Sequence, residues 1–227
     1  MKMKIVAIIP ARGGSKGIPE KNLALINGKP LIAWSIEHAI SSSLIDEVWV
    51  SSDSEKILRF SESIGAKIIK RPADISGDEA SSESAWIHAI ENIQQDDDVE
   101  LVVAMQATSP IRNKNDLDNA IIKYKENRLD SLFSSNILDD MNYWCVDKNN
   151  KLYSANYDYK DRKRRQDVNE KFLENGSFYI FTPQGILHSK NRLHGNIGCY
   201  VMEKRTMFQI DEKEDMEICE SIMRDFN

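Results

Sequence analysis

The stretch that decides the fold is KIVAIIPARGGSKGIPEKN, residues 4–22. Its first seven residues are almost all apolar and rich in isoleucine and valine, the composition of a short buried strand. The run ends in a turn that holds three glycines and three cations: Gly13, Gly14, Gly17, Arg12, Lys16 and Lys21. Because ligands of open parallel sheets sit at the carboxyl ends of the strands, we expect this turn to bind one.

The residue types of the turn indicate which ligand it suits. Glycines let backbone N–H groups converge on an anion, and a triphosphate needs several cations around it. The turn is not a Walker A loop, because no Gly-Lys-Ser/Thr follows, and the GxGxxG spacing of dinucleotide folds is absent. A flexible surface turn with solvated lysines is the alternative; three cations placed directly after a strand favour phosphate binding.

The rest of the chain extends the pattern that begins with this strand. Short apolar runs alternate with amphipathic segments through residue 135, and further strands are expected at residues 47–52, 67–70, 101–106, 131–135, 177–181 and 198–202. Helical stripes are formed by Leu31, Ile32, Ile36, Ala39 and Ile40, and by Ala85, Trp86, Ala89, Ile90 and Ile93. A closing helix is expected from about Glu212. The alternation predicts an α/β fold with a Rossmann-like, mostly parallel sheet covered on both faces.

Residues 138–175 interrupt the alternation. They are polar and include the charged run DYKDRKRRQ, residues 158–166. A segment this short and polar cannot bury a core of its own. We therefore expect one domain, residues 1–227, carrying residues 138–175 as an inserted arm or lid that packs on a second subunit.

Composition limits the partners. The 227 residues are 41% hydrophobic and 29% charged with a formal net charge of -6, which argues against nucleic acid and anionic membranes as partners. The three cysteines, Cys145, Cys199 and Cys219, form no CxxC pair and no disulfide framework, as in a reducing compartment. Because no apolar stretch is long enough to span a membrane, we expect a cytoplasmic protein.

Six segments, in order along nearly the whole chain, resemble a known family. They are residues 8–22 (IIPARGGSKGIPEKN), 25–39 (LINGKPLIAWSIEHA), 71–82 (RPADISGDEASS), 105–112 (MQATSPIR), 174–180 (ENGSFYI) and 210–215 (IDEKED). The first segment together with Q-x-T-S-P-x-R is similar to the acylneuraminate cytidylyltransferases, or CMP-sialic acid synthetases. The resemblance implies a sheet of the nucleotidyltransferase type and an insertion that is a dimerisation arm reaching into the partner's site, hence a homodimer.

The resemblance also implies a role for each residue around the nucleotide CTP. Cations Arg12, Lys16 and Lys21, with the backbone of Gly13, Gly14 and Ser15, would hold the phosphates, and Asn22 the ribose. Arg71 and the backbone from Ala80 to Ser82 would contact the cytosine edge, whose O2, N3 and N4 suit an arginine with nearby carbonyls. For Arg71 alone, a surface arginine after a strand is the alternative.

On the sugar-acid side, the resemblance places Gln106, Arg165 and Tyr179 against the substrate. Arg165 would bind the planar carboxylate with its guanidinium fork; a solvated charge run is the alternative. The Ser109-Pro110 turn with Arg112 is interpreted as structural.

The cofactor implied is Mg²⁺, which carboxylates hold against phosphate oxygens. Related enzymes carry Asp-Ile-Asp before the last helix, whereas this chain has Gln209-Ile210-Asp211. We expect Asp211 to be the ligand, with Gln209 as a second candidate acting through its neutral oxygen or through water. Asp215 is expected to support the N-terminus of the closing helix.

The predicted reaction is attack of the anomeric C2 hydroxyl of a 2-keto sugar acid on the α-phosphorus of CTP, releasing pyrophosphate. Arg12, Lys16, Lys21 and Asp211 would carry the catalysis, and no residue identifies itself as a general base. Residues 139–144 depart from the His-Pro and lysine frequent in the sialate enzymes, so legionaminic acid, pseudaminic acid or another 2-keto sugar acid stays open beside N-acetylneuraminate. A sugar-1-phosphate nucleotidyltransferase and, on the strength of Gln209, a catalytically silent nucleotide-binding paralogue are the rival interpretations.

Overall fold

The computed structural model describes residues 3–15, 17–95, 98–138, 141–167 and 169–225, and their central feature is a 7-stranded sheet. Its order is β11-β7-β10-β6-β1-β4-β5. The strands are β1 (Lys4–Pro10), β4 (Glu47–Ser52), β5 (Lys67–Lys70), β6 (Val99–Met105), β7 (Ser131–Ile137), β10 (Phe172–Phe181) and β11 (Ile197–Val201). Neighbouring strands are parallel except that β10 runs antiparallel to both β6 and β7. The prediction of a mostly parallel α/β sheet is confirmed.

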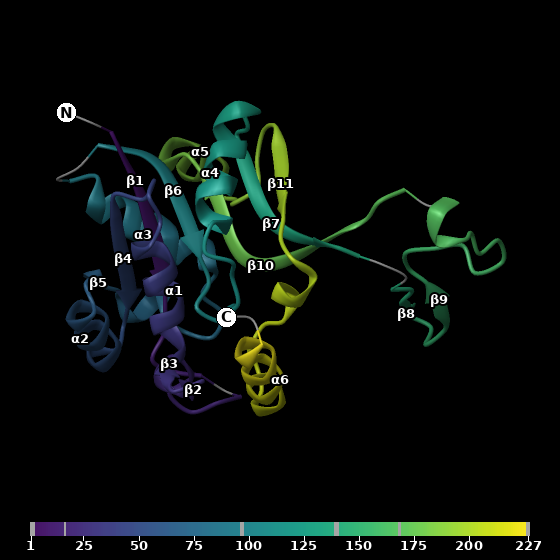
Figure 1. Ribbon diagram of the computed structural model, residues 1–227, viewed down its shortest axis with the longest axis horizontal. Coiled ribbons are helices and arrows are strands. Elements are labelled where there is room, and N and C mark those ends of the chain that lie inside the picture. The colour runs from purple at the N-terminus through teal and green to yellow at the C-terminus, as the bar shows by residue number, and fades with distance from the viewer. Residues whose placement is uncertain (1–2, 16, 96–97, 139–140, 168, 226–227) are drawn as a thin grey trace.

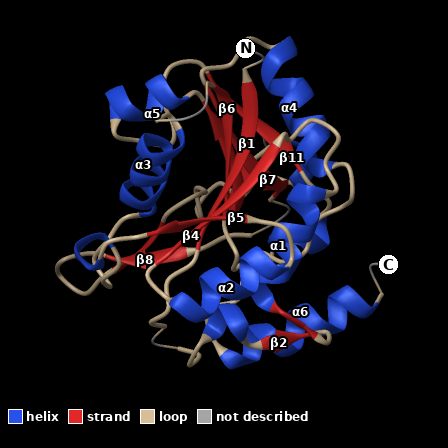
Figure 2. Ribbon diagram, turned by 90° about the vertical axis from the view of Figure 1, so that its left-hand side faces the viewer, coloured by secondary structure: helices blue, strands red, loops and turns tan. Residues whose placement is uncertain are grey.

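Helices cover both faces of the sheet (Figure 2). Helices α1 (Leu31–Ile40), α2 (Glu55–Ser63) and α4 (Asp116–Glu126) pack on one face, and α3 (Ser82–Ile93) and α5 (Pro183–Ser189) on the other. The predicted stripes supply the buried contacts: Ile32, Ile36 and Ala39 belong to the first core, and Trp86 and Ile90 to the second. No helix in the described ranges is long and apolar enough to cross a membrane.

A third, smaller core joins the N-terminal loop to the last helix. Helix α6 (Lys213–Arg224) packs near the small hairpin of β2 (Leu25–Ile26) and β3 (Lys29–Pro30), and Cys219 and Met223 are buried there with Ile18 and Ile210. The single turns η1 (Lys21–Leu23), η2 (Ala73–Ile75) and η4 (Lys204–Met207) complete the body. The end of the chain is therefore held against the loop that follows β1.

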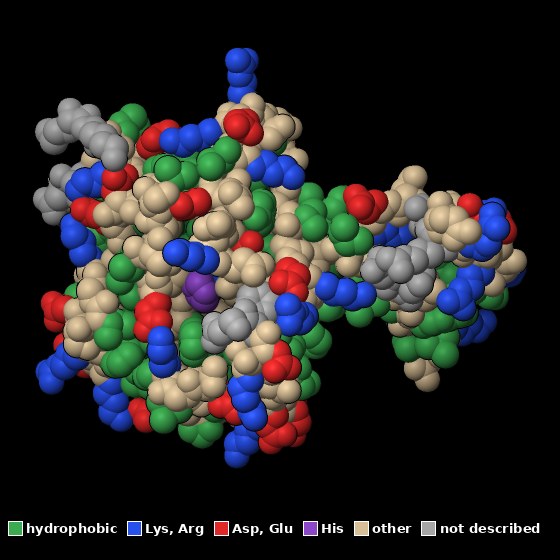
Figure 3. All heavy atoms as spheres, viewed as in Figure 1, with side chains coloured by type: hydrophobic (Ala, Val, Ile, Leu, Met, Phe, Trp, Pro, Cys, Tyr) green, Lys and Arg blue, Asp and Glu red, His purple; other side chains and the backbone are tan. Residues whose placement is uncertain are grey.

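Between β7 and β10 the chain leaves the body as an arm (Figure 1). It carries the hairpin of β8 (Trp144–Val146) and β9 (Leu152–Ser154) and the turn η3 (Arg165–Asp167). Large apolar side chains stand exposed on it, among them Tyr143, Trp144, Val146, Leu152 and Tyr153 (Figure 3). The segment between β7 and β10 is shorter than the expected insertion of residues 138–175, because residues 172–175 already belong to β10. Its role in association stays a prediction.

The antiparallel direction of β10 matters for the site. Strands β1, β4 and β6 end at one edge of the sheet, where their loops begin, while β10 begins at that edge because its direction is reversed. The expected strand at residues 177–181 is the buried half of β10; its first half contains Glu174, Asn175 and Gly176, whose polarity hides a strand from pattern analysis. Residues 174–176 are thereby brought to the edge that carries the first loop.

Candidate active site

A cavity of about 300 Å³ opens at the carboxyl edge of β1 and β6. Its walls come from the first loop, the segment after β5, the N-terminus of α3 and the loop after β6. Eight residues predicted for nucleotide or substrate binding line it: Arg12, Ser15, Lys21, Asn22, Arg71, Ala80, Ser82 and Gln106. Segments far apart in sequence thus meet where the edge rule for parallel sheets places a ligand. Lys16 lies outside the described residues.

The first loop is fixed by its own backbone and by the loop after β4. The Asn22 side chain, nearly buried, donates from Nδ2 to the carbonyl oxygen of Arg12 at 3.0 Å. The backbone N–H of Gly13 donates to Oδ1 of Asp53 at 2.9 Å. A Cβ on Gly14 would meet no atom within 4 Å, so the backbone there faces open space. An anion can approach this glycine closely, as the predicted phosphate cradle requires.

The Arg12 side chain spans the cavity and pairs with an acid on its far wall. Its Nη1 lies 2.7 Å from Oδ1 of Asp78. Both side chains are partly exposed, at 36% and 49%, so this pair contributes little to stability. A triphosphate placed in the cavity would compete with Asp78 for the guanidinium.

Lys21 links the first loop to the segment before α6. Its Nζ donates to the carbonyl oxygen of Ile210 at 2.9 Å and pairs with Oδ1 of Asp211 at 3.0 Å. The chain also touches there through Gly17, because a Cβ on that residue would collide with the carbonyl oxygen of Asp211. The expected metal ligand, Asp211, is therefore paired with Lys21, which lines the cavity.

Asp215 has the structural role expected of it. Its Oδ2 accepts from the backbone N–H groups of Asp211 at 2.9 Å and Glu212 at 2.8 Å, and with Glu212 it forms a capping box on α6. These two N–H donors lower the pKa of Asp215. The cap holds Asp211 at the start of the helix, with a side chain 73% exposed.

Arg71 is not the surface arginine of the alternative interpretation. It is 6% exposed and donates from Nε to the hydroxyl of Ser76 at 3.1 Å, while Nη2 lies 3.9 Å from Oδ1 of Asp53. Burial lowers its pKa, and the Asp53 carboxylate opposes that effect. A buried guanidinium on a cavity wall suits recognition of a ligand edge. Its contact with cytosine stays a prediction.

Sequence reasoning missed two acids: Asp78, which lines this cavity, and Asp53, which contacts Gly13 and Arg71. Asp53 follows β4 at the carboxyl edge and connects Gly13 to Arg71, and the edge rule applied to residues 47–52 would have found it. Asp78 lies inside a segment already singled out, but its ion pair with Arg12 joins residues 66 apart and leaves no local pattern.

Tyr179, a second residue expected to contact the sugar acid, lies in β10. Tyr179 is 3% exposed; its ring packs on Trp86 at 5.8 Å, and the guanidinium carbon of Arg192 lies 4.8 Å from the ring centroid. The tyrosine hydroxyl donates to Oε1 of Glu174 at 2.6 Å. Burial, and then the Glu174 carboxylate, raises the pKa of Tyr179 to about 12. The phenol is therefore neutral, and its hydroxyl reaches toward the edge that carries the cavity.

Arg192 is also held by a carboxylate. It forms a fork with Glu83, Nε to Oε1 at 2.6 Å and Nη2 to Oε2 at 2.9 Å. This pair ties the loop before β11 to the first turn of α3, whose neighbouring residues Ser82 and Ala85 line the cavity. Neither Glu83 nor Arg192 was indicated by the sequence.

Arg112 confirms the structural interpretation of its turn. It is 3% exposed and donates to the carbonyl oxygens of Gln106 at 3.0 Å and Ser177 at 2.9 Å, and to the hydroxyl of Ser35 at 3.0 Å. Desolvation lowers its pKa to about 9. By joining the ends of β6 and β10 it fixes where Gln106 enters the cavity.

The two expected metal ligands differ in availability. Asp211 presents an exposed carboxylate, whereas Gln209 donates from Nε2 to the carbonyl oxygen of Asn175 at 2.5 Å. That hydrogen bond uses the amide nitrogen of Gln209, and the amide oxygen is the atom that could contact a metal ion. The described ranges hold no group of three or more histidine, cysteine or acidic side chains arranged for a metal. The residues present fit Mg²⁺ as one carboxylate and one neutral oxygen, the rest of its shell coming from water and phosphate.

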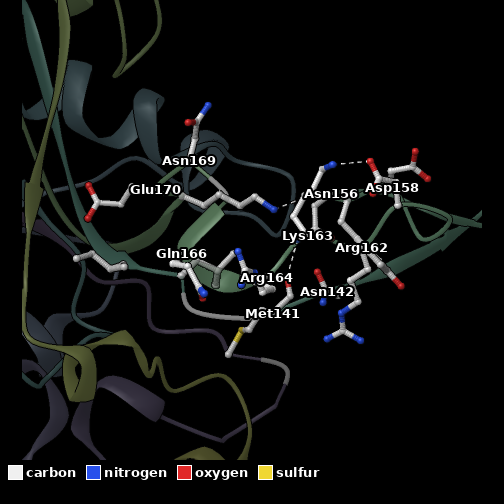
Figure 4. Close-up of a pocket in the computed structure, with 15 residues that line it drawn as sticks. Met141, Asn142, Asn156, Asp158, Arg162, Lys163, Arg164, Gln166, Asn169 and Glu170 are labelled. Carbon is white, nitrogen blue, oxygen red and sulfur yellow. Dashed lines mark hydrogen bonds and ion pairs between the residues drawn. The ribbon is translucent and has the colours of Figure 1, made fainter.

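A second cavity, about 990 Å³, lies on the arm (Figure 4). Three cations of the charged run, Arg162, Lys163 and Arg164, line it together with acidic and amide side chains. Arg165 begins η3 on the same arm, away from the first cavity of its own chain, and its side chain lies outside the described part. The structure therefore does not bring Arg165 together with Gln106 and Tyr179 within one chain.

Comparisons with known proteins identify the family of this chain and relate its fold to a solved structure. The profile of a family described as cytidylyltransferase matches residues 6–225. A pseudaminic acid cytidylyltransferase of Campylobacter jejuni is 35% identical over 98% of this chain and 97% of its own length. An N-acylneuraminate cytidylyltransferase of Escherichia coli is 32% identical over 100% of this chain and 54% of its own, longer chain. A solved CMP:2-keto-3-deoxy-manno-octonic acid synthetase in complex with CTP shares the fold, with a TM-score of 0.73 at 16% identity over 98% of this chain and 99% of that one.

Proposed function

This chain belongs to the cytidylyltransferase family, and on that premise we propose that it transfers CMP from CTP to the anomeric hydroxyl of a 2-keto sugar acid. The observation that carries the proposal is the cavity at the carboxyl edge of β1, where Arg12, Lys21 and Arg71 converge beside glycine backbone. The relatives named for pseudaminic acid and N-acylneuraminate support a sugar acid as the acceptor.

In the proposed reaction the C2 hydroxyl oxygen of the sugar acid attacks the α-phosphorus of CTP. A P–O bond to the sugar forms, the P–O bond to the β-phosphate breaks, and pyrophosphate leaves; the hydroxyl proton passes to solvent. Arg12 and Lys21, with Lys16 expected beside them, neutralise the phosphate charge, and the N–H groups at Gly14 and Ser15 approach it. The chain's contribution is positioning and electrostatic stabilisation.

The nucleotide is oriented by the walls of the same cavity. Arg71 and the backbone from Ala80 to Ser82 would contact the cytosine edge, and Asn22 the ribose; all of them line the cavity. Because Asn22 already donates to the Arg12 carbonyl, its side-chain oxygen is the group left to accept from a ribose hydroxyl.

Mg²⁺ is the proposed cofactor, and Asp211 would hold it together with the amide oxygen of Gln209. When bound it would supply charge neutralisation at the α- and β-phosphates. Lys21 keeps the Asp211 carboxylate near the phosphate loop through their 3.0 Å ion pair.

We also propose a homodimer assembled through the arm. The exposed apolar side chains of β8 and β9 and the basic cavity beside them support this assignment, because a monomer leaves that surface in water. In a dimer, the arm could carry Arg165 to the site of the partner subunit, where the sugar carboxylate would be bound. The free cysteines support a reducing, cytoplasmic location.

The test is pyrophosphate release by purified protein with Mg²⁺, each of the four nucleoside triphosphates, and a panel of acceptors. The panel contains N-acetylneuraminate, legionaminic and pseudaminic acids, and sugar 1-phosphates. Release that requires CTP and a 2-keto sugar acid is the expected result. Release only with sugar 1-phosphates, or CTP binding without turnover, would replace the proposal by one of the two rival interpretations.

A further inference from the structure

Strand β10 contains an irregularity that brings two side chains of the site together. In a regular strand, residues five apart point to opposite faces and lie about 16 Å apart. Here the register shifts between Glu174 and Tyr179, Gly176 has a φ of 64°, and the Tyr179 hydroxyl donates to Oε1 of Glu174 at 2.6 Å. The bend therefore brings the side chain of Glu174 into contact with Tyr179, five residues later in the strand.

The bend is locked by a buried amide. Asn175 is 1% exposed; its Nδ2 donates to Oδ1 of Asn136 at 2.8 Å, and its Oδ1 accepts from the Ser134 hydroxyl at 2.6 Å and the Ser177 N–H at 3.1 Å. Its carbonyl oxygen accepts from Gln209. A buried polar side chain satisfied on every side rigidifies the segment that carries it. Glu174 is thus held in place before any ligand arrives.

The Glu174 side chain is exposed and lies two residues before Gly176, which borders a residue of the nucleotide cavity. A Cβ on Gly176 would come within 3.3 Å of Oε1 of Gln106, which lines that cavity. Within the part of the chain that the structure describes, Oε2 of Glu174 has no hydrogen-bond partner. The nearby cation, Arg192, is forked to Glu83, so its charge is already balanced.

We propose that Glu174, oriented by the Tyr179 hydroxyl, is a hydrogen-bond acceptor for the sugar acid, which makes Glu174 a specificity-determining residue and Tyr179 its positioning residue. Tyr179 is 3% exposed and donates its single proton to Glu174, while Arg192 lies against its ring, so the lone pairs open to a substrate are those of the exposed Glu174 carboxylate. Hydroxyl and acylamino N–H groups on the sugar ring or side chain are the donors that fit. The carboxylate of the substrate is repelled from this end, so the pair also fixes which way the sugar acid enters. This inference rests on the proposed function and deepens it.

The test compares Glu174→Gln with the wild type, using CTP and the sugar acid that the wild type turns over fastest. Glutamine keeps the shape and removes the charge, so hydrogen bonds to a charged acceptor become hydrogen bonds to a neutral one. We expect KM for the sugar acid to rise about tenfold or more, with KM for CTP changed less than twofold. Tyr179→Phe should raise the same KM, and the double variant should show less than the product of the two effects because the groups act as a pair.

The controls separate a substrate contact from a structural role. Glu126→Gln, on an exposed turn of α4, should change neither KM nor the melting temperature. The inference would be overturned if Glu174→Gln left KM for the sugar acid unchanged, or if the variant needed more Mg²⁺ but showed no rise in that KM. Either result would leave the proposed function standing. If the wild type releases no pyrophosphate with any 2-keto sugar acid, the proposed function and this inference fall together.

Discussion

Replacing Gly176 by alanine tests the bend of β10 with a matched control. Gly176 has a φ of 64° and Gly28, in the turn between β2 and β3, has a φ of 80°. A side chain in this region costs about 1–2 kcal/mol at either position. The surroundings differ, because a Cβ on Gly28 meets nothing within 4 Å, whereas a Cβ on Gly176 lies 2.6 Å from Nε2 of Gln209.

The excess cost of Gly176→Ala follows from that contact. Gln209 can move away, but it then gives up its hydrogen bond to the carbonyl oxygen of Asn175. A hydrogen bond of this kind stabilises by about 1 kcal/mol, which corresponds to about 2–4 °C in a chain of this size. We expect Gly28→Ala to lower the free energy of unfolding by about 1–2 kcal/mol and Gly176→Ala by about 2–3 kcal/mol.

Urea denaturation and thermal melting of both variants provide the comparison, with kcat/KM for the sugar acid as a second measurement. Gly176→Ala should also reduce kcat/KM by at least about tenfold, because Gln106 and Gln209 border the same position, whereas Gly28→Ala should leave it unchanged. In a Gln209→Ala background the excess destabilisation should disappear. Equal stability of the two glycine variants, or an excess that persists without the Gln209 amide, would refute the reasoning.

Three further predictions concern single charges. Asp211→Asn should abolish pyrophosphate release while changing the melting temperature by less than about 2 °C, since the side chain is 73% exposed; retained turnover would remove the metal assignment. Asp78→Asn should lower KM for CTP about two- to threefold by freeing Arg12, as steady-state kinetics would show, and an unchanged or higher KM would contradict the competition. Burial lowers the pKa of His38 from 6.5 to about 4, so the unfolded chain binds the extra proton and stability should fall as pH drops from about 6.5 to 4, by up to about 3 kcal/mol. His38→Gln should flatten that part of a melting-temperature series, and a parallel decline in both proteins would argue against it.

The buried strands of the sheet could be predicted from the sequence, because burial produces a local pattern of apolar residues. The apolar runs at residues 4–10, 47–52 and 67–70 coincide with β1, β4 and β5. A cavity also lies where the edge rule predicts a ligand, at the ends of β1 and β6. The role of Asp215 was predicted correctly, because an acid in the first turn stabilises the N-terminus of a helix, and in α6 it does so as part of a capping box.

Tertiary structure decided which side chains meet, because that depends on the order of the strands and on where they bend. Lys21 and Asp211 are 190 residues apart, and nothing local to either predicts that they pair. Glu174 and Tyr179 are close in sequence, yet a regular strand would hold them on opposite faces, and only the buried Asn175 and the left-handed Gly176 bring them together. A local pattern records how much of a side chain is buried, because that depends on its own position in a helix or strand; which partner it meets depends on how distant segments pack.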